Sequence, residues 1–380
     1  MLSFWESQSY LDQDYLIIGA GIVGLSTAAS LLEKQPHARV AILERGILPA
    51  GASTKNAGFA CFGSLTELLS DIQAFGVDTA LSIVESRWRG LRRLRERLGD
   101  GQLAYENLGG FELLAEEQLS VLDRLDEVNT LLRPIFGAPV FHRADEALAG
   151  FGFSRHRVST LLCNPHESQL DPGRMMRALA TYVQARGGLI VSGAQVEDYE
   201  CGSHAVTVGV RHDALGERIR FRGRALGVCT NAFASQLIPG LDIQPGRGQV
   251  VITEPIPGLP VRGTFHSHEG YFYFRNVGDR VLLGGGRHLD FAGESTTAFS
   301  DNSTISSALE SLMHEVILPG RDVRIAQRWS GIMAFGATKK PIVARVGPRV
   351  HVGVRMGGMG IAIGSNVGHE LAAMMRTEAE

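Results

Sequence analysis

The sequence has few cysteines, no long apolar run and almost no net charge. Its four cysteines, Cys61, Cys163, Cys201 and Cys229, lie far apart, without the paired spacing of a disulfide framework or a zinc site. We therefore expect reduced thiols and a cytoplasmic location. No stretch reaches the roughly 20 apolar residues that a membrane span requires. The N-terminus also lacks the basic start and apolar run of a signal peptide.

The charge balance excludes partners that bind through strong electrostatics. A formal net charge of −3, from 37 basic and 40 acidic residues, gives no basis for binding nucleic acid or an acidic membrane. The chain has 380 residues, of which 44% are hydrophobic. This length and composition suit a globular protein with two domains and ample core material.

A strand–turn–helix–strand unit stands near the N-terminus. The apolar run 15–18 predicts a buried strand, 22–34 a helix and 40–43 a second strand that ends in Glu44. Three glycines in G-x-G-x-x-G spacing join the first strand to the helix: Gly19, Gly21 and Gly24. This order of elements is typical of a dinucleotide-binding βαβ unit.

Each part of the unit has a physical role in binding a dinucleotide. The first glycine permits the tight turn, the second lets a pyrophosphate approach the backbone, and the third lets helix and strand pack closely. The helix start adds a positive dipole end, and Glu44 can bond ribose hydroxyls while repelling a 2′-phosphate. FAD and NAD both remain open at this point. The predicted contacts are Gly19, Gly21, Ile22, Val23, Gly24, Glu44 and Arg45.

The segment after Glu44 is rich in small residues and supports a resemblance to a known family. Its run "STKNAG" is similar to a G-x-S-x-x-N-x-G-like segment of the D-amino-acid oxidase superfamily of FAD proteins. That superfamily includes glycine oxidase, sarcosine oxidase and gamma-glutamylputrescine oxidase. The resemblance implies contacts to the pyrophosphate and flavin from Ser53, Thr54, Lys55, Asn56, Ala57 and Gly58.

The resemblance continues through the middle of the chain. Residues 173–200 resemble the helix and strand that return the chain to the nucleotide domain, with the strand ending near Val196. In the family the residue like Val196 faces adenine through its backbone. Residues 225–233, which include Thr230, resemble the next nucleotide-domain strand and its closing turn. Gly331, in "WSGIM", is a further expected cofactor contact.

A second glycine-rich turn near the C-terminus favours FAD over NAD. It lies between a predicted strand, 350–354, and a helix that runs to Met375, so it places N–H groups and a positive dipole end at one point. In the resembled proteins this point lies at the pyrimidine edge of the flavin, where reduction places negative charge. The expected contacts are Arg355, Gly357, Gly358, Met359, Gly360 and Ile361. We expect FAD to be bound non-covalently.

The resemblance implies an α/β fold with two interleaved domains. A Rossmann-like FAD-binding domain of the glutathione-reductase type comprises residues 1–75, 155–235 and 322–380. A substrate or cap domain, built on a large antiparallel or mixed sheet, comprises 76–154 and 236–321.

Four residues are candidates for the substrate side of the site. Tyr271 and Tyr273 alternate along a predicted strand and share one face. Met333 stands where amino-acid oxidases of the family have a carboxylate-binding arginine, which favours the amine-oxidising branch. Arg355 is the candidate that could hold a carboxylate instead. His266 and His268 form an H-x-H pair without a third ligand nearby, so we expect no metal site.

The expected activity is oxidation of a C–N bond in an amine or amino acid. Hydride passes from the carbon to FAD, and the imine is then hydrolysed in water. The electron acceptor is O2 or another compound, because the place of a lysine that promotes oxygen reduction in sarcosine oxidase falls near Leu282. Alternatives are a 2-hydroxy acid dehydrogenase and a protein that holds FAD without turnover. An NAD enzyme is the least favoured.

Overall fold

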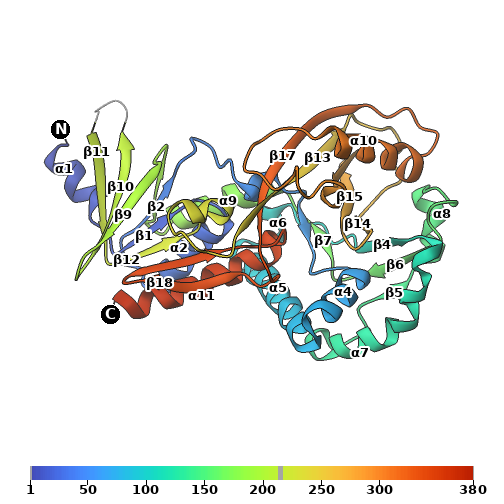
Figure 1. Cartoon of the computed structure of the whole chain (residues 1–380), viewed down its shortest axis with the longest axis horizontal. Coiled ribbons are helices and arrows are strands. Elements are labelled where there is room, and N and C mark those ends of the chain that lie inside the picture. The colour runs from blue at the N-terminus through green and yellow to red at the C-terminus, as the bar shows by residue number, and fades with distance from the viewer. Residues whose placement is uncertain (1, 213–216, 380) are drawn as a thin grey trace.

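The computed structural model describes residues 2–212 and 217–379, arranged around two large β-sheets that follow one another along the molecule (Figure 1). The first sheet has six strands in the order β18-β19-β12-β1-β2-β8, parallel except for the antiparallel edge strand β18. Its strands are β1 (Tyr15–Ile18), β2 (Val40–Glu44), β8 (Leu189–Ser192), β12 (Ala225–Val228), β18 (Ile342–Gly347) and β19 (Val350–Val354). The strands predicted at 15–18, 40–43 and 350–354 are confirmed.

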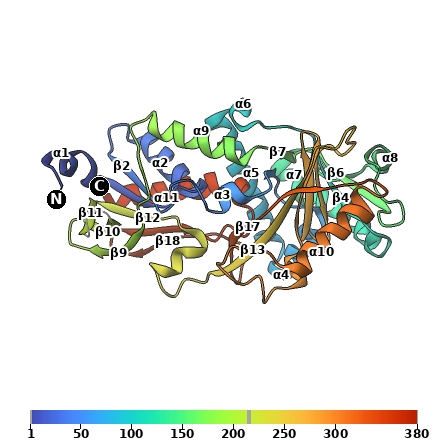
Figure 2. The same cartoon turned by 90° about the horizontal axis from the view of Figure 1, so that it is seen from above.

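The central strand β1 is apolar throughout because both of its faces are covered. Tyr15 and Ile17 belong to a core with the helices α2 (Ile22–Lys34), α5 (Val77–Leu98), α9 (Pro172–Gln184) and α11 (Gly360–Ala379). Leu16 and Ile18 belong to a second core with an antiparallel three-stranded sheet. That sheet consists of β9 (Val196–Cys201), β10 (Val206–His212) and β11 (Glu217–Gly223). Figure 2 shows α2 and α9 on one side of β12 and this small sheet on the other.

The predicted end of one strand was wrong. The strand predicted to end near Val196 is β8, which ends at Ser192, and Val196 begins β9. Gly193, with a φ of +73°, turns the chain between the two strands. A glycine adopts this left-handed conformation without steric cost, so the apolar pattern alone did not reveal the break.

The second large sheet has eight strands in the order β17-β13-β16-β15-β14-β4-β6-β5. They are β4 (Gly110–Leu114), β5 (His142–Arg143), β6 (Thr160–Asn164), β13 (Gln244–Thr253), β14 (Thr264–Ser267), β15 (Phe272–Val277), β16 (Arg280–Gly285) and β17 (Ile325–Phe335). The strand predicted to carry Tyr271 and Tyr273 is found as β15, which pairs with β16 in a hairpin, but it begins at Phe272, so Tyr271 precedes the strand. His266, however, lies on the separate strand β14.

The eight-stranded sheet also has two different faces. Phe265 and Phe274 stack with their ring centroids 4.7 Å apart and pack under α10 (Ser303–Leu312). The opposite face carries Leu114 and Leu162, which pack with α4 (Leu65–Phe75), α5 and α7 (Leu125–Phe136). Shorter elements are α1 (Phe4–Glu6), α3 (Ala52–Lys55), β3 (Phe59–Ala60), α6 (Asp100–Leu103), α8 (Leu148–Phe151) and β7 (Ser168–Gln169).

The proposed division into two domains stays a prediction, but two details of its boundaries differ from the sheets. Strands β6 and β17 belong to the eight-stranded sheet, although the ranges 155–235 and 322–380 placed them on the nucleotide side. Helix α5, which was placed in the substrate domain, packs against α11 in the core of the six-stranded sheet. All four cysteines are free thiols. In the described part of the chain, no helix is long and apolar enough to cross a membrane.

Close packing of α5 on α11 gives a prediction about stability. A Cβ added to Gly90 would lie 2.0 Å from the carbonyl oxygen of Ala362, so Gly90→Ala must push the two helices apart. Overpacking of this kind typically costs about 1–3 kcal/mol, although alanine by itself favours a helix. We expect a lower free energy of unfolding in urea denaturation. Gly101→Ala is the control, since nothing lies within 4 Å of that position, and equal stability of both variants would contradict the prediction.

Candidate active site

A cavity of about 990 Å³ lies between the two large sheets. Its walls come from the ends of β1 and β2, the starts of α2 and α11, and the strands β13, β15, β16 and β17. Ligand pockets commonly measure about 300–1,000 Å³. The cavity therefore has room for an extended ligand such as a dinucleotide together with a small substrate.

The first glycine turn is held by very close backbone contact. Gly19 has a φ of +99°, and a Cβ added to Gly24 would lie 1.9 Å from the carbonyl oxygen of Gly19. The carboxylate of Glu44 accepts hydrogen bonds from the N–H groups of Ala20 at 2.8 Å and Gly46 at 2.9 Å. Glu44 thus lies beside the turn at the edge of the cavity.

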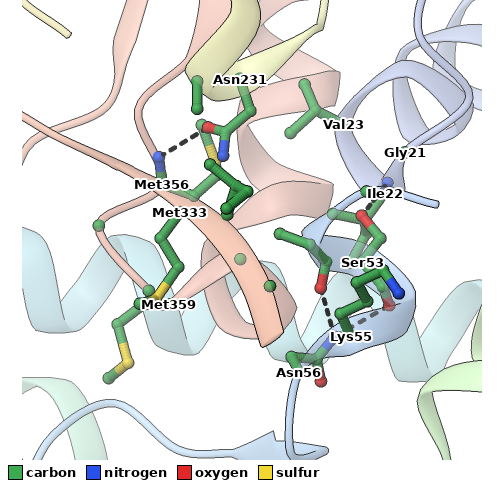
Figure 3. Close-up of a pocket in the computed structure, with 18 of the residues that line it drawn as sticks. Gly21, Ile22, Val23, Ser53, Lys55, Asn56, Asn231, Met333, Met356 and Met359 are labelled. Carbon is green, nitrogen blue, oxygen red and sulfur yellow. Dashed lines mark hydrogen bonds between the residues drawn. The ribbon is translucent and has the colours of Figure 1, made fainter. Parts of the chain in front are cut away.

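The segment 53–58 lies against the start of α2. The N–H of Ile22 donates to Ser53 Oγ at 3.0 Å, as Figure 3 shows. Within the segment, the side chain of Asn56 donates to the carbonyls of Ala52 and Ser53 and accepts from the N–H of Gly58. The amide of Asn56 therefore fixes the bend of this segment, and its conformation does not depend on a ligand.

The C-terminal glycine turn faces the cavity from the other side. Gly357 and Gly358 have φ values of +57° and +83°, and α11 begins at Gly360. The amide oxygen of Asn231 accepts from the N–H of Met356 and thereby ties this turn to the loop after β12 (Figure 3). Met333 from β17 lies beside the turn, and its sulfur would lie 3.5 Å from a Cβ added to Gly358. Two helix starts thus converge on one cavity.

Most of the residues predicted for the site line this cavity. They are Gly19, Gly21, Ile22, Val23, Glu44, Arg45, Ser53, Lys55, Asn56, Ala57, Gly58, Val196, Thr230, Tyr271, Tyr273, Gly331, Met333, Gly357, Gly358, Met359, Gly360 and Ile361. Gly24 and Thr54 do not line it. Gly24 packs against Gly19, as its predicted role requires, and the hydroxyl of Thr54 bonds the carbonyl of Pro49.

The structure does not support the predicted role of Arg355 in holding a substrate carboxylate. Its side chain is buried outside the cavity lining, where it pairs with Asp242 and donates to Thr338 and to the carbonyl of Lys340. A Cβ added to Gly336 would lie 2.6 Å from its Nη1, so the absence of a side chain at Gly336 makes room for the guanidinium. These contacts occupy the donors that a substrate carboxylate would need. The guanidinium of Arg355 therefore fixes the segment 336–340 beside Asp242.

The structure adds charged residues that the sequence patterns did not bring together. Lys339 Nζ lies 2.6 Å from Asp71 Oδ1 and 3.3 Å from Glu67 Oε1, and all three line the cavity. Burial raises the pKa of Glu67, but the charges of Lys339, Arg87 and His266 outweigh burial and lower it. These residues come from distant segments, so spacing gave no signal for their meeting.

A comparison with protein families identifies this chain. The sequence pattern of the family described as FAD dependent oxidoreductase, or DAO, matches residues 14–374. The chain belongs to the DAO family of FAD-dependent oxidoreductases. The match covers both glycine turns and both large sheets, so the resemblance seen in the sequence is confirmed.

The relatives of this chain have names that indicate different substrates. L-2-hydroxyglutarate dehydrogenase of Escherichia coli O17:K52:H18 is 25% identical over 239 residues, which cover 61% of this chain and 51% of that protein. The chain thus matches about half the length of that relative. Glycine oxidase of Geobacillus kaustophilus (strain HTA426) is 25% identical over 344 residues, or 84% of this chain and 80% of that protein.

A solved structure supports the fold. The crystal structure of glycine oxidase from Geobacillus kaustophilus superposes with a TM-score of 0.77 and 22% identity, and covers 97% of this chain and 95% of that one. At this level of identity the likeness concerns the fold alone. The α/β architecture, with its parallel nucleotide-binding sheet beside a large mixed sheet, is the one predicted.

The residues of the cavity fit FAD. The hydroxyl of Thr230 is buried in the lining without a hydrogen-bond partner among the described residues, so it is available to hydrogen-bond a ligand. Gly21, the residue before α2, provides no side-chain cap, and Ser53 bonds the first N–H of the helix, so the positive helix end remains open to a pyrophosphate beside Ser53. Glu44 and the turn at Gly357 line opposite sides of the cavity, so contacts of Glu44 with the ribose and of the turn with the flavin ring stay predictions. When bound, FAD supplies the hydride acceptor.

Removing the charge of Glu44 tests this fit. We expect Glu44→Gln to weaken FAD binding about 10-fold or more, since hydrogen bonds to a charged group contribute roughly 1.5–3 kcal/mol. Titration of the FAD-free protein with FAD, followed by flavin fluorescence, measures the change. Glu85→Gln, an exposed residue on α5, is the control. Equal affinity of both variants would show that Glu44 does not contact FAD.

Proposed function

We propose that this protein oxidises the C–N bond of an amino acid or of another amine that carries a carboxylate. The observation that carries the proposal is Arg287, a cation in the cavity lining with no acidic partner among the described residues. The substrate carbon loses hydride to FAD, and the imine product is hydrolysed in water.

Arg287 is held in place by aromatic rings and not by acids. Its guanidinium carbon lies 4.2 Å from the ring centroid of Phe335 and 5.0 Å from that of Phe291. Its Nε is buried without a hydrogen-bond partner in the described structure. A Cβ added to Gly246 would lie 2.4 Å from Phe335 and 2.9 Å from Nε, so glycine at 246 makes room for this stack.

The electrostatics of Arg287 favour an anionic ligand. Burial lowers its pKa, although the charges of Tyr271 and Glu294 oppose the shift. A half-buried guanidinium is more stable with a counterion, and a carboxylate matches its planar fork with two parallel hydrogen bonds. Arg287 can therefore take over the carboxylate-binding role that Met333 cannot perform.

The remaining walls near Arg287 are apolar or aromatic. Met333 is an adaptable apolar residue, and Tyr273 is half-buried and packs on Phe59 with ring centroids 5.5 Å apart. Tyr271 is 40% exposed and lies over His288 at 4.6 Å. We propose that these four residues, Arg287 included, bind the substrate and exclude water from it.

A 2-hydroxy acid is the second candidate substrate. The relatives named as L-2-hydroxyglutarate dehydrogenase support it, and Arg287 would hold a hydroxy acid by the same carboxylate. The electron acceptor is O2 or another compound. The apolar Leu282, which packs beside Ala57, provides no charge that would promote oxygen reduction.

An anaerobic screen tests the proposed function. The holoprotein is mixed with amines, N-methyl amino acids, D- and L-amino acids and 2-hydroxy acids, and loss of flavin absorbance is recorded before air is readmitted. We expect bleaching by carboxylated amines. Bleaching by hydroxy acids alone would replace the proposal with the second candidate. No bleaching by any compound would indicate a protein that holds FAD without turnover. Recovery of absorbance in air shows whether O2 is an acceptor.

Substitution of Arg287 tests how the carboxylate is bound. We expect Arg287→Met to raise KM for a carboxylated substrate about 30-fold or more, because loss of one partner of a buried charge pair costs about 2 kcal/mol or more. KM for the same amine without its carboxylate should change little. Arg89→Met, an exposed residue on α5, is the control. An equal effect on both substrates would assign Arg287 a structural role.

A further inference from the structure

A row of side chains crosses the cavity face of the eight-stranded sheet. Glu112 on β4, His266 on β14 and Tyr273 on β15 are register partners in adjacent strands. They point away from Phe265 and Phe274, which fill the core on the opposite face. His266 and Tyr273 line the cavity, so the sheet presents an imidazole beside the proposed substrate position.

His266 is oriented by a buried carboxylate. Its Nε2 lies 2.9 Å from Glu167 Oε2, and the histidine and the glutamate are 6% and 1% exposed. The Nδ1 atom has no partner in the described structure. A Cβ added to Gly110 would lie 2.2 Å from Glu167 Oε2, so glycine at 110 provides the space for this carboxylate. An ionised carboxylate accepts hydrogen bonds but cannot donate one, so the bond to Glu167 requires a proton on Nε2 of His266.

The charges that face His266 come from several elements. Burial lowers its pKa, but the carboxylates of Glu167, Glu112 and Glu67 outweigh burial and raise it. Glu67 is itself paired with Arg87 on α5 and with Lys339. The imidazole is therefore a stronger base than an ordinary histidine.

Cys61 lies beside this pair and is also among the residues that line the cavity. Ligand atoms of Cys61, Glu167 and His266 lie within 4.8 Å of one another. Burial and the charges of Glu167 and Glu67 raise the pKa of the Cys61 thiol well above its usual range. A thiol that stays protonated is neither a nucleophile nor a good metal ligand. The reactive group of the cluster is then the imidazole.

We propose that His266 is the catalytic base that deprotonates the substrate, and that Glu167 is its positioning residue. The inference rests on the proposed function. An N–H bond of the substrate ammonium, or the O–H bond of a hydroxy acid, breaks, and its electron pair stays on nitrogen or oxygen. The proton forms a bond to His266 Nδ1. No oxidant is needed for this step, and the proton later passes to water.

The tautomer explains why Glu167 matters. With the Nε2 proton held by Glu167, the lone pair of neutral His266 lies on Nδ1, the nitrogen without a protein partner. This is the arrangement by which a carboxylate orients a histidine base in hydrolytic triads. Only the neutral amine or the alkoxide releases hydride readily, so a base on the cavity wall prepares the substrate for oxidation.

The test is the pH dependence of kcat/KM for a substrate found in the screen. In the wild-type protein the value should rise with pH as His266 loses its proton, with an apparent pKa above the ordinary 6.5. This rise is the ascending limb of the pH profile. His266→Gln should lower kcat/KM about 100-fold or more and remove the ascending limb. Glu167→Gln should move the limb to lower pH, because the charge that raises the pKa of His266 is lost. A limb due to the substrate's own ammonium does not move between variants.

His268→Gln is the matched control, since the imidazole of this exposed neighbour hydrogen-bonds Ser267 and lies outside the cavity lining. An unchanged pH profile in His266→Gln, with wild-type turnover intact, would overturn the base while leaving the proposed function standing. No turnover of any substrate by the wild-type protein would instead overturn the proposed function.

Nitrogen NMR of labelled histidine in the resting holoprotein gives a readout that does not depend on turnover. The inference expects a neutral His266 protonated on Nε2, with a raised pKa that falls in Glu167→Gln. A proton on Nδ1 would overturn it. So would one bound metal ion per chain that is lost in Cys61→Ser, because the imidazole would then be a metal ligand.

Discussion

The close approach of helix α2 to the turn before it is the constraint on which the site depends. Gly24 leaves no space for a side chain against Gly19, and this contact directs the start of α2 into the cavity. Helix α11 then packs on α2 in the same way, because a Cβ added to Gly368 would lie 2.8 Å from the backbone nitrogen of Thr27. The second glycine turn is thereby placed opposite the first. Close contact between backbones at these glycines therefore directs two positive helix ends toward one cavity.

Local patterns predicted much of the fold but little of the chemistry around the substrate. The strand at 15–18, the helix at 22–34 and the turn at 357–360 follow from apolar periodicity and glycine spacing, which act over a few residues. The DAO resemblance supplied the arrangement of the sheets. Arg287 was missed because its signal is a stack on Phe335, 48 residues away and without any fixed spacing. Arg355 was misplaced because proximity to the glycine turn along the chain did not reveal its pairing with Asp242.

The cavity separates its functions by the element that supplies each group. Loops at the ends of parallel strands line the part of the cavity proposed for the dinucleotide, as expected for an open α/β sheet. The second sheet and the turn that follows β16 provide the groups proposed for the substrate, with Arg287 among aromatic rings in that turn and His266 among carboxylates on β14. Cross-strand register on β14 and β15 fixes the positions of His266 and Tyr273. Loop variation on the first sheet and residue changes on the second can therefore evolve separately, which is consistent with relatives that share a fold and differ in substrate.

The order of segments along the chain has a consequence for biosynthesis. The cavity uses residues from Gly19 at one extreme to Ala362 at the other, and α11 fills the core against α2. A nascent chain on the ribosome that lacks α11 leaves the apolar face of α2 bare and has only one of the two glycine turns. Assembly of the complete cofactor site must therefore await synthesis of α11, and until then the face of α2 that α11 covers is available to chaperones.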